Sequence, residues 1–210
     1  MVRYKTVMKE AEAEQVIEKS RFICHVKPVD SREEAEAFFV QIRAENRGAA
    51  HNVPAFVIGE KAELQWASDD GEPQGTSGAP IVQMLVKEGI HNVAVIVTRY
   101  FGGIKLGTGG LVRAYTSSVK LGLEAAIYCE VREQAILRVK VAYTYYDKLQ
   151  NLAVSEGFFL EDAEYTDVVT VSLAMEPSRL EEIKMNLSDL TGGTGEVLSE
   201  TLKLVKVRAE

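Results

Sequence analysis

The chain has 210 residues, a hydrophobic fraction of 46% and a formal net charge of −7, which is the composition of an ordinary globular protein. The 14 acidic and 8 basic residues from Glu133 onward carry most of that charge, which excludes a strong general DNA binder. Two distant cysteines exclude a disulfide framework and a zinc pattern. With no signal peptide or long apolar span in the sequence, we expect a soluble, cytoplasmic protein.

The first predicted elements are strands at Val2–Val7 and Glu14–Val26. Alternation along the second strand places three side chains on one face, those of Phe22, Cys24 and Val26. Cys24 is therefore predicted to be a small core residue, with its neighbour His25 pointing the opposite way.

A helix follows, because Ser31 and Glu34 have capping-box spacing and an apolar stripe runs behind them until Asn46. A strand is predicted near residues 55–58, and His51 precedes it. His51 is interpreted in two ways, as a hydrogen-bonded part of the scaffold or as a ligand or proton carrier.

Three carboxylates, Asp69, Asp70 and Glu72, crowd a loop with glycine and proline on either side. Oxygen ligands of this kind suit Mg²⁺ or Ca²⁺, but they also build turns or pair with arginines such as Arg99 and Arg113. We predict no bound metal and no cofactor. Thr76 or Ser77 is predicted to open a short helix that ends at Gly89.

The central stretch is Asn92–Ala126. Its apolar run Val93–Val97 is too short for a helix and predicts a buried strand. A glycine-rich segment follows at 102–110, and the amphipathic run from Leu111 to Ala126 predicts a helix. Between Ile90 and Leu123 there are four basic residues and no acidic one.

In this stretch a strand is followed by a glycine loop and then by a helix. That order brings together free backbone amides and the positive end of a helix dipole, which favours an anion site. The alternative is that the glycines serve only loop geometry. Tyr100 is a candidate to stack on bases, whereas Phe101 is expected in the core. The predicted anion-binding or nucleic-acid-binding residues are Arg99, Tyr100, Gly102, Gly103, Lys105, Gly107, Thr108, Gly109, Gly110 and Arg113.

The second half of the chain predicts strands at 135–142, 158–165, 168–175 and 196–207, and helices at 146–155 and 177–190. The order β-α-β-β-α-β is the split arrangement of a ferredoxin-like sandwich. We therefore predict an α+β protein with one domain at 1–131 and a ferredoxin-like domain at 132–210.

Three motifs resemble the IMPACT family in its bacterial, YigZ-like, two-domain form. They are Ser68–Pro73 with Gly75-Thr76, Val97–Gly103, and Leu106–Tyr115. The resemblance implies an N-terminal domain like the second domain of a small-subunit ribosomal protein, with helices on one face of its sheet. It also implies a C-terminal domain like the last domain of elongation factor G, and a link to translation. The chain departs from the family pattern at Ala79, where a basic residue is common.

Three functions follow as hypotheses. The first is a non-catalytic, translation-associated protein that engages RNA, the ribosome or a protein partner through the glycine-rich surface. The second is an enzyme that acts on a phosphorylated substrate with His51, Asp69, Asp70 and Glu72. The third is purely structural, with these carboxylates fastening the glycine loop through Arg99 and Arg113. The oligomeric state is not predicted.

Overall fold

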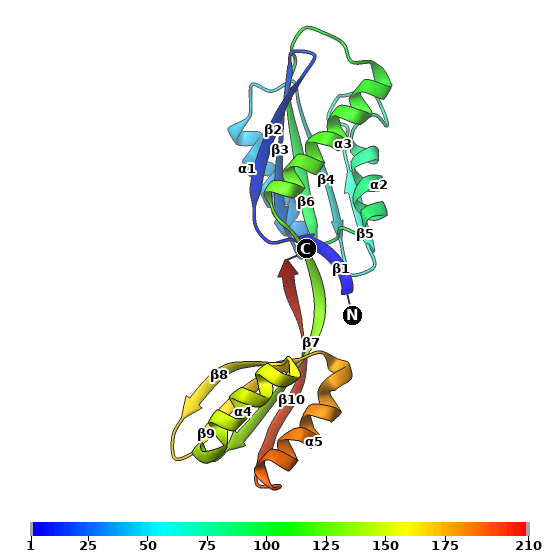
Figure 1. Ribbon diagram of the computed structural model, residues 1–210. Coiled ribbons are helices and arrows are strands. Elements are labelled where there is room, and N and C mark those ends of the chain that lie inside the picture. Colours follow the sequence, from blue (N-terminus) through cyan, green and yellow to red (C-terminus); the bar gives the residue numbers. More distant parts are fainter. Residues whose placement is uncertain (1, 209–210) are drawn as a thin grey trace. The chain divides into compact units, whose positions relative to one another are not determined.

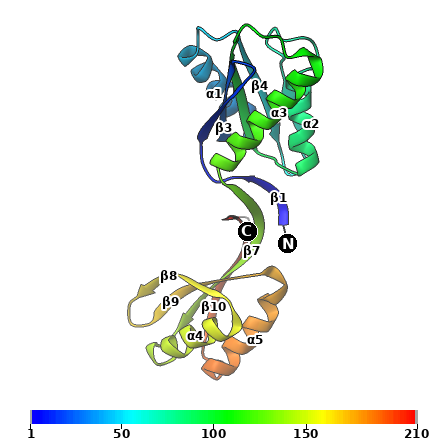
Figure 2. The same ribbon diagram turned by 45° about the horizontal axis from the view of Figure 1, so that its top comes forward.

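The computed structural model describes residues 2–208, which divide into two compact units, Val2–Val131 with the last residues of β10, and Arg132–Val205. Figures 1 and 2 show the elements of each unit. The division into domains at 1–131 and 132–210 stays a prediction. No helix in the described part of the chain has the length and apolarity needed to cross a membrane.

The first unit is built on a five-stranded sheet in the order β2-β3-β6-β4-β5, and its pairs are antiparallel. Its elements are β1 (Val2–Val7), β2 (Ala11–Ile17), β3 (Ser20–Pro28), α1 (Arg32–Glu45), β4 (His51–Ile58), β5 (Leu64–Ala67), α2 (Gly78–Glu88), β6 (Val93–Tyr100) and α3 (Gly107–Ala125). The central strand β6 corresponds to the predicted buried run.

Helices cover both faces of this sheet, so the expectation of helices on one face is wrong. Val93, Val95 and Val97 of β6 pack with α2 and α3, whereas Ala94 and Ile96 pack with α1. In Figures 1 and 2, α1 lies on the opposite side of the sheet from α2 and α3. The cause is in the sequence, because an unbroken apolar run has no side chain suited to water on either face.

The predicted strand Glu14–Val26 is instead a hairpin, β2 and β3, in which Ile17 pairs with Ser20. Glu18 and Lys19 form its turn, with positive φ angles of 46° and 63°. Two successive left-handed residues suit the twist of a two-residue hairpin. The sequence did not reveal the turn because it lacks the glycine or asparagine that usually marks one.

The helix signals of α1 and α2 are confirmed, whereas α3 begins at Gly107 and not at the predicted Leu111, so residues 107–110 form its first turn and not a loop. The Ser31 hydroxyl accepts from the Glu34 amide, and the Glu34 carboxylate accepts from the amide of Asp30, one residue earlier than in the usual capping box. Asn46 and Gly89 end α1 and α2 as predicted.

The second unit confirms the split β-α-β-β-α-β order, with strands arranged β10-β7-β9-β8. Its helices α4 and α5 pack on one face of the sheet around a single core. The elements are β7 (Tyr128–Val141), α4 (Tyr143–Glu156), β8 (Phe159–Tyr165), β9 (Val169–Met175), a 3₁₀ turn (Pro177–Arg179), α5 (Leu180–Thr191) and β10 (Glu196–Arg208).

Candidate functional site

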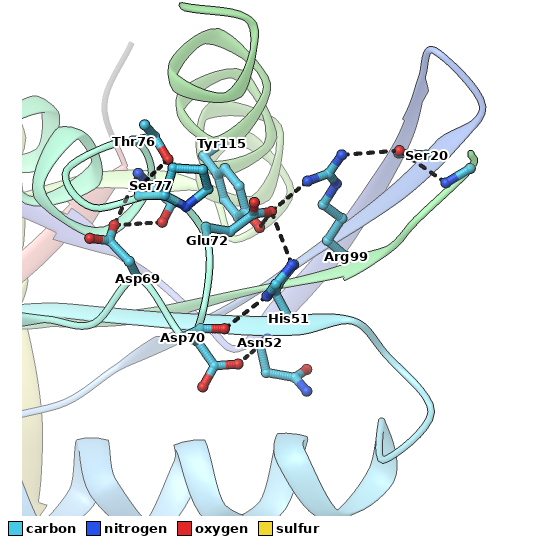
Figure 3. A network of polar contacts seen from close by, with 12 residues as sticks. Ser20, His51, Asn52, Asp69, Asp70, Glu72, Thr76, Ser77, Arg99 and Tyr115 are labelled. Carbon is cyan, nitrogen blue, oxygen red and sulfur yellow. Dashed lines mark hydrogen bonds and ion pairs between the residues drawn. The ribbon is translucent and has the colours of Figure 1, made fainter. Parts of the chain in front are cut away.

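A buried polar network lies at the end of β6, where the apolar row of Val93, Val95 and Val97 continues into Arg99. His51 of β4 is the register partner of Arg99 in the sheet. Figure 3 shows both side chains directed toward Glu72 of the loop between β5 and α2. Arg99 is only 5% exposed and Glu72 8%, so this is a charged cluster inside the first unit.

Glu72 is the centre of the network. Its Oε1 accepts from Arg99 Nη1 at 2.6 Å and from the Tyr115 hydroxyl at 2.8 Å. Burial and the neighbouring negative charge of Glu72 raise the pKa of Tyr115, so the phenol stays protonated and donates. The carboxylate therefore joins the end of β6 to the middle of α3.

His51 is oriented by the backbone. Its Nδ1 lies 2.8 Å from the carbonyl oxygen of Asp70, which can only accept, so Nδ1 carries a proton. Nε2 lies 3.8 Å from Glu72 Oε1, which is too long for a direct hydrogen bond. His51 thus acts as a second, weaker contact between β4 and the loop.

Asp69 caps α2. One of its oxygens accepts from the Ser77 hydroxyl at 2.7 Å and the Gly78 amide at 2.9 Å, and the other from the Gly75 amide at 2.8 Å. Burial acts to raise the pKa of Asp69, but these hydrogen bonds outweigh it and hold the pKa below its ordinary value. The cap comes from Asp69 rather than from the Ser77 side chain.

Asp70 holds the start of β4. Its Oδ2 accepts from the Asn52 amide at 2.6 Å, and its Oδ1 lies 3.3 Å from Arg43 of α1. Within residues 2–208 no group of three or more His, Cys, Asp or Glu side chains converges in a way that could hold a metal ion. The three loop carboxylates instead accept hydrogen bonds from other residues of the chain.

The glycine segment 102–110 follows β6 and has two parts, a loop and the start of α3. Gly102 passes so close to the β2–β3 turn that an added Cβ would lie 2.0 Å from the carbonyl carbon of Lys19, and its amide donates to Ser20 Oγ at 3.2 Å. Gly103 and Gly107 adopt positive φ angles of 86° and 70°. These three glycines serve loop geometry.

The start of α3 is the exposed part. Its first turn contains no acidic residue, and no side chain caps it. Thr108 and Gly109 are exposed there, and so are the side chains of Lys105 and Arg113. The first amides of a helix have no partner within it, so this surface presents backbone donors and two cations.

The comparisons with known proteins fit these motifs. Residues 18–123 match the family described as Impact N-terminal domain, and residues 139–194 match a domain of unknown function, DUF1949. The chain belongs to the IMPACT family. It is 39% identical over 194 residues to the IMPACT family member YvyE of Bacillus subtilis, covering 92% of this chain and 89% of the relative.

It is also 32% identical to the IMPACT family member YigZ of Escherichia coli, over 87% of this chain and 91% of that protein. A solved crystal structure, titled only as that of a hypothetical protein, covers 93% of this chain and 96% of its own, with 29% identity and a TM-score of 0.58. Membership of the IMPACT family supports, in general terms, a role in the regulation of translation.

Within this IMPACT-family fold, the predicted anion-binding residues do not share one surface. Arg99 lies beneath the glycine segment and is paired with Glu72, so it is not an exposed phosphate ligand. Tyr100 follows it in the strand and therefore faces the α1 side, where its hydroxyl donates to Asn46. Lys105, Gly107, Thr108, Gly109, Gly110 and Arg113 remain together at the start of α3.

Other residues differ from expectation. Phe101 is 52% exposed and not in the core, and its ring centroid lies 5.5 Å from the Arg99 guanidinium carbon. Arg99 pairs with Glu72 as the structural hypothesis predicts, whereas Asp69 and Asp70 make other contacts. Sequence reasoning missed Tyr115 and Ser20 as members of the network. The sequence gave one weak indication of the role of Tyr115, which is its polar hydroxyl within the otherwise apolar stripe of the helix.

Proposed function

We propose that this IMPACT-family protein is a non-catalytic, translation-associated RNA-binding protein that holds RNA phosphates at the start of α3. The observation that carries the proposal is the exposed first turn of α3, which has free backbone amides, no acidic residue and no side-chain cap. Backbone amides at a helix N-terminus and flanking cations are a common phosphate ligand set.

The buried network beneath this surface supports the proposal by giving it rigidity. Glu72 connects Arg99 on β6 with Tyr115 on α3, so the loop between these elements is fixed at both ends. A preformed surface loses less conformational entropy when it binds. Because Asp69, Asp70 and Glu72 are engaged in internal contacts, a binding role is better supported than the alternative of an enzyme acting on a phosphorylated substrate.

The test compares two double variants of the full chain by fluorescence anisotropy with a labelled single-stranded RNA over a range of salt concentrations. Lys105→Ala/Arg113→Ala removes the two cations beside α3. Lys61→Ala/Lys87→Ala is the matched control, because it removes two exposed cations elsewhere on the same unit.

Two lost phosphate contacts are expected to reduce the slope of log K against log salt by about 1.4, at about 0.7 per contact for a single strand. The control is expected to keep the wild-type slope. Equal binding by both double variants at every salt concentration would show that RNA does not use this surface.

A further inference from the structure

Strand β8 is an edge of the second unit's sheet. Among the residues that the structure describes, it pairs with β9 and with no strand on its other side. Alternate residues of such a strand direct their backbone N–H and C=O groups away from the neighbouring strand. The register shift between Glu161 and Glu164 interrupts this edge, so it suits a short added strand better than a long one.

An apolar hollow of about 340 Å³ lies beside the start of β8. Val154 of α4 and Phe159 of β8 line it and are 86% and 68% exposed, so both side chains would gain by leaving water. Gln150 is the one lining residue with a polar side chain. The hollow therefore matches an apolar side chain of a partner.

One face of α4 continues the hollow along the strand. Four exposed residues at spacings of four, three and four positions share that face, and they are Tyr143, Asp147, Gln150 and Val154. At the far end of β8, the ring of Tyr143 stacks on that of Tyr165, with centroids 6.4 Å apart. This face of α4 and β8 are thus neighbours along the length of the strand.

The charge of β8 and its turn is negative. Segment 159–167 contains four acidic residues and no basic one. Two of the four are neutralised by other strands, because Glu161 lies 2.8 Å from Lys203 and Glu164 lies 3.0 Å from Arg138. Any further cation at this edge has to come from a partner.

Asp147 and Asp162 decide which kind of partner fits. Both are exposed, and within residues 2–208 neither has a cation at ion-pair distance. A second copy of the chain would place two acidic β8 edges opposite each other, and RNA would bring phosphates toward carboxylates, so both are repelled. A basic polypeptide is attracted.

We propose that β8 and the hollow beside it bind an extended, lysine- and arginine-rich peptide segment of another protein. The segment adds a strand along the outer edge of β8, brings its cations to Asp147 and Asp162, and places one apolar side chain in the hollow. This site lies on the second unit, so it is separate from the surface at the start of α3.

The experiment is fluorescence anisotropy of the full chain with a short labelled peptide in which lysine and threonine alternate around a central leucine. Asp147→Asn/Asp162→Asn removes the two unpaired charges, and asparagine tolerates the positive φ of 44° at residue 162. Asp189→Asn/Glu196→Gln is the matched control, because it removes two exposed carboxylates elsewhere on the second unit. We expect the first variant to bind about fivefold more weakly and the control to match wild type.

A second arm changes the peptide and leaves the protein intact, so folding of a variant does not enter. A peptide with N-methyl groups on alternate residues keeps its charges and side chains but loses the backbone donors that β8 would use. We expect it to bind at least about tenfold more weakly than the unmethylated peptide.

Four outcomes would overturn the proposal. Equal binding of the two peptides would exclude strand addition at β8. Equal weakening by the two double variants would mean that the peptide responds only to net charge. A dimer that Asp147→Asn/Asp162→Asn strengthens in sedimentation would make this edge a contact between two copies. Displacement of the peptide by single-stranded RNA would assign the surface to RNA.

Discussion

The buried pair of Glu72 and Arg99 gives the sharpest stability prediction. In Glu72→Gln the side chain keeps its size but loses the negative charge that the guanidinium requires. Arg99 is left charged with a side chain only 6% exposed, and its Nε already has no hydrogen-bond partner. The arginine cannot lose its proton, so the charge stays buried and uncompensated.

Removal of one partner of a buried ion pair costs about 3–5 kcal/mol. The amide oxygen of glutamine can still accept from Tyr115 and Arg99, so we expect the lower end, about 3 kcal/mol. The exposed pair of Arg32 and Glu36, with both side chains 53% exposed, is the matched control. Glu36→Gln is expected to cost about 0.5 kcal/mol or less.

The assay is urea unfolding followed by the fluorescence of Trp66, the single tryptophan of the sequence. With a urea dependence of about 2 kcal/mol/M, a loss of 3 kcal/mol lowers the midpoint by about 1.5 M. Glu72→Gln/Arg99→Met removes both charges and is expected to recover part of the loss. The Glu72–Arg99 pair does not have this role if Glu72→Gln unfolds at the same midpoint as Glu36→Gln, or if the double variant is no more stable than the single one.

Three further predictions concern the same unit. Gly102→Ala should lower the free energy of unfolding in urea by about 3 kcal/mol, because the added Cβ meets the Lys19 backbone. The control Gly48→Ala, whose Cβ would have nothing within 4 Å, should change that free energy by less than about 0.5 kcal/mol. Equal urea midpoints for the two variants would contradict the prediction. The pKa of Asp69 is lower folded than unfolded, so its stabilisation is complete above the unfolded value near 3.8 and is lost as pH falls through the folded value. Thermal melts of Asp69→Asn should therefore show a weaker acid dependence than wild type, and an unchanged dependence would remove Asp69 as a cause. Burial raises the pKa of Cys24, so a thiol reagent at pH 8 should modify it only after denaturation, and rapid modification of the native chain would show that the site opens.

Local patterns were sufficient for much of the fold. The unbroken run Val93–Val97 predicted a buried strand, the pair Ser31 and Glu34 predicted the start of α1, and the alternation after residue 135 predicted the split β-α-β-β-α-β order. Each of these signals depends on residues close in sequence, which is why a single chain reveals them. The β2–β3 turn was missed because Glu18 and Lys19 carry no turn signal of their own.

The candidate site shows where local patterns fail. The glycine segment and the helix after it were found from sequence, because a strand, a glycine segment and an amphipathic helix follow one another directly, but α3 starts at Gly107 and not at the predicted Leu111. The sequence did not determine which carboxylate pairs with Arg99, because three carboxylates were available in one loop. Only the folded chain selects Glu72, and it turns Asp69 toward α2 and Asp70 toward β4 instead.

The sequence by itself determined the order of the elements after residue 135, the buried strand at the centre of the first unit and the membership of a family. The tertiary structure alone decided which charges are exposed and which are neutralised inside. The reason is physical: periodicity records whether a side chain prefers water or the core, whereas the partner of a buried charge depends on segments that only folding brings together. Arg99 and Arg113 look alike in the sequence, yet one is buried against Glu72 and the other faces solvent at α3.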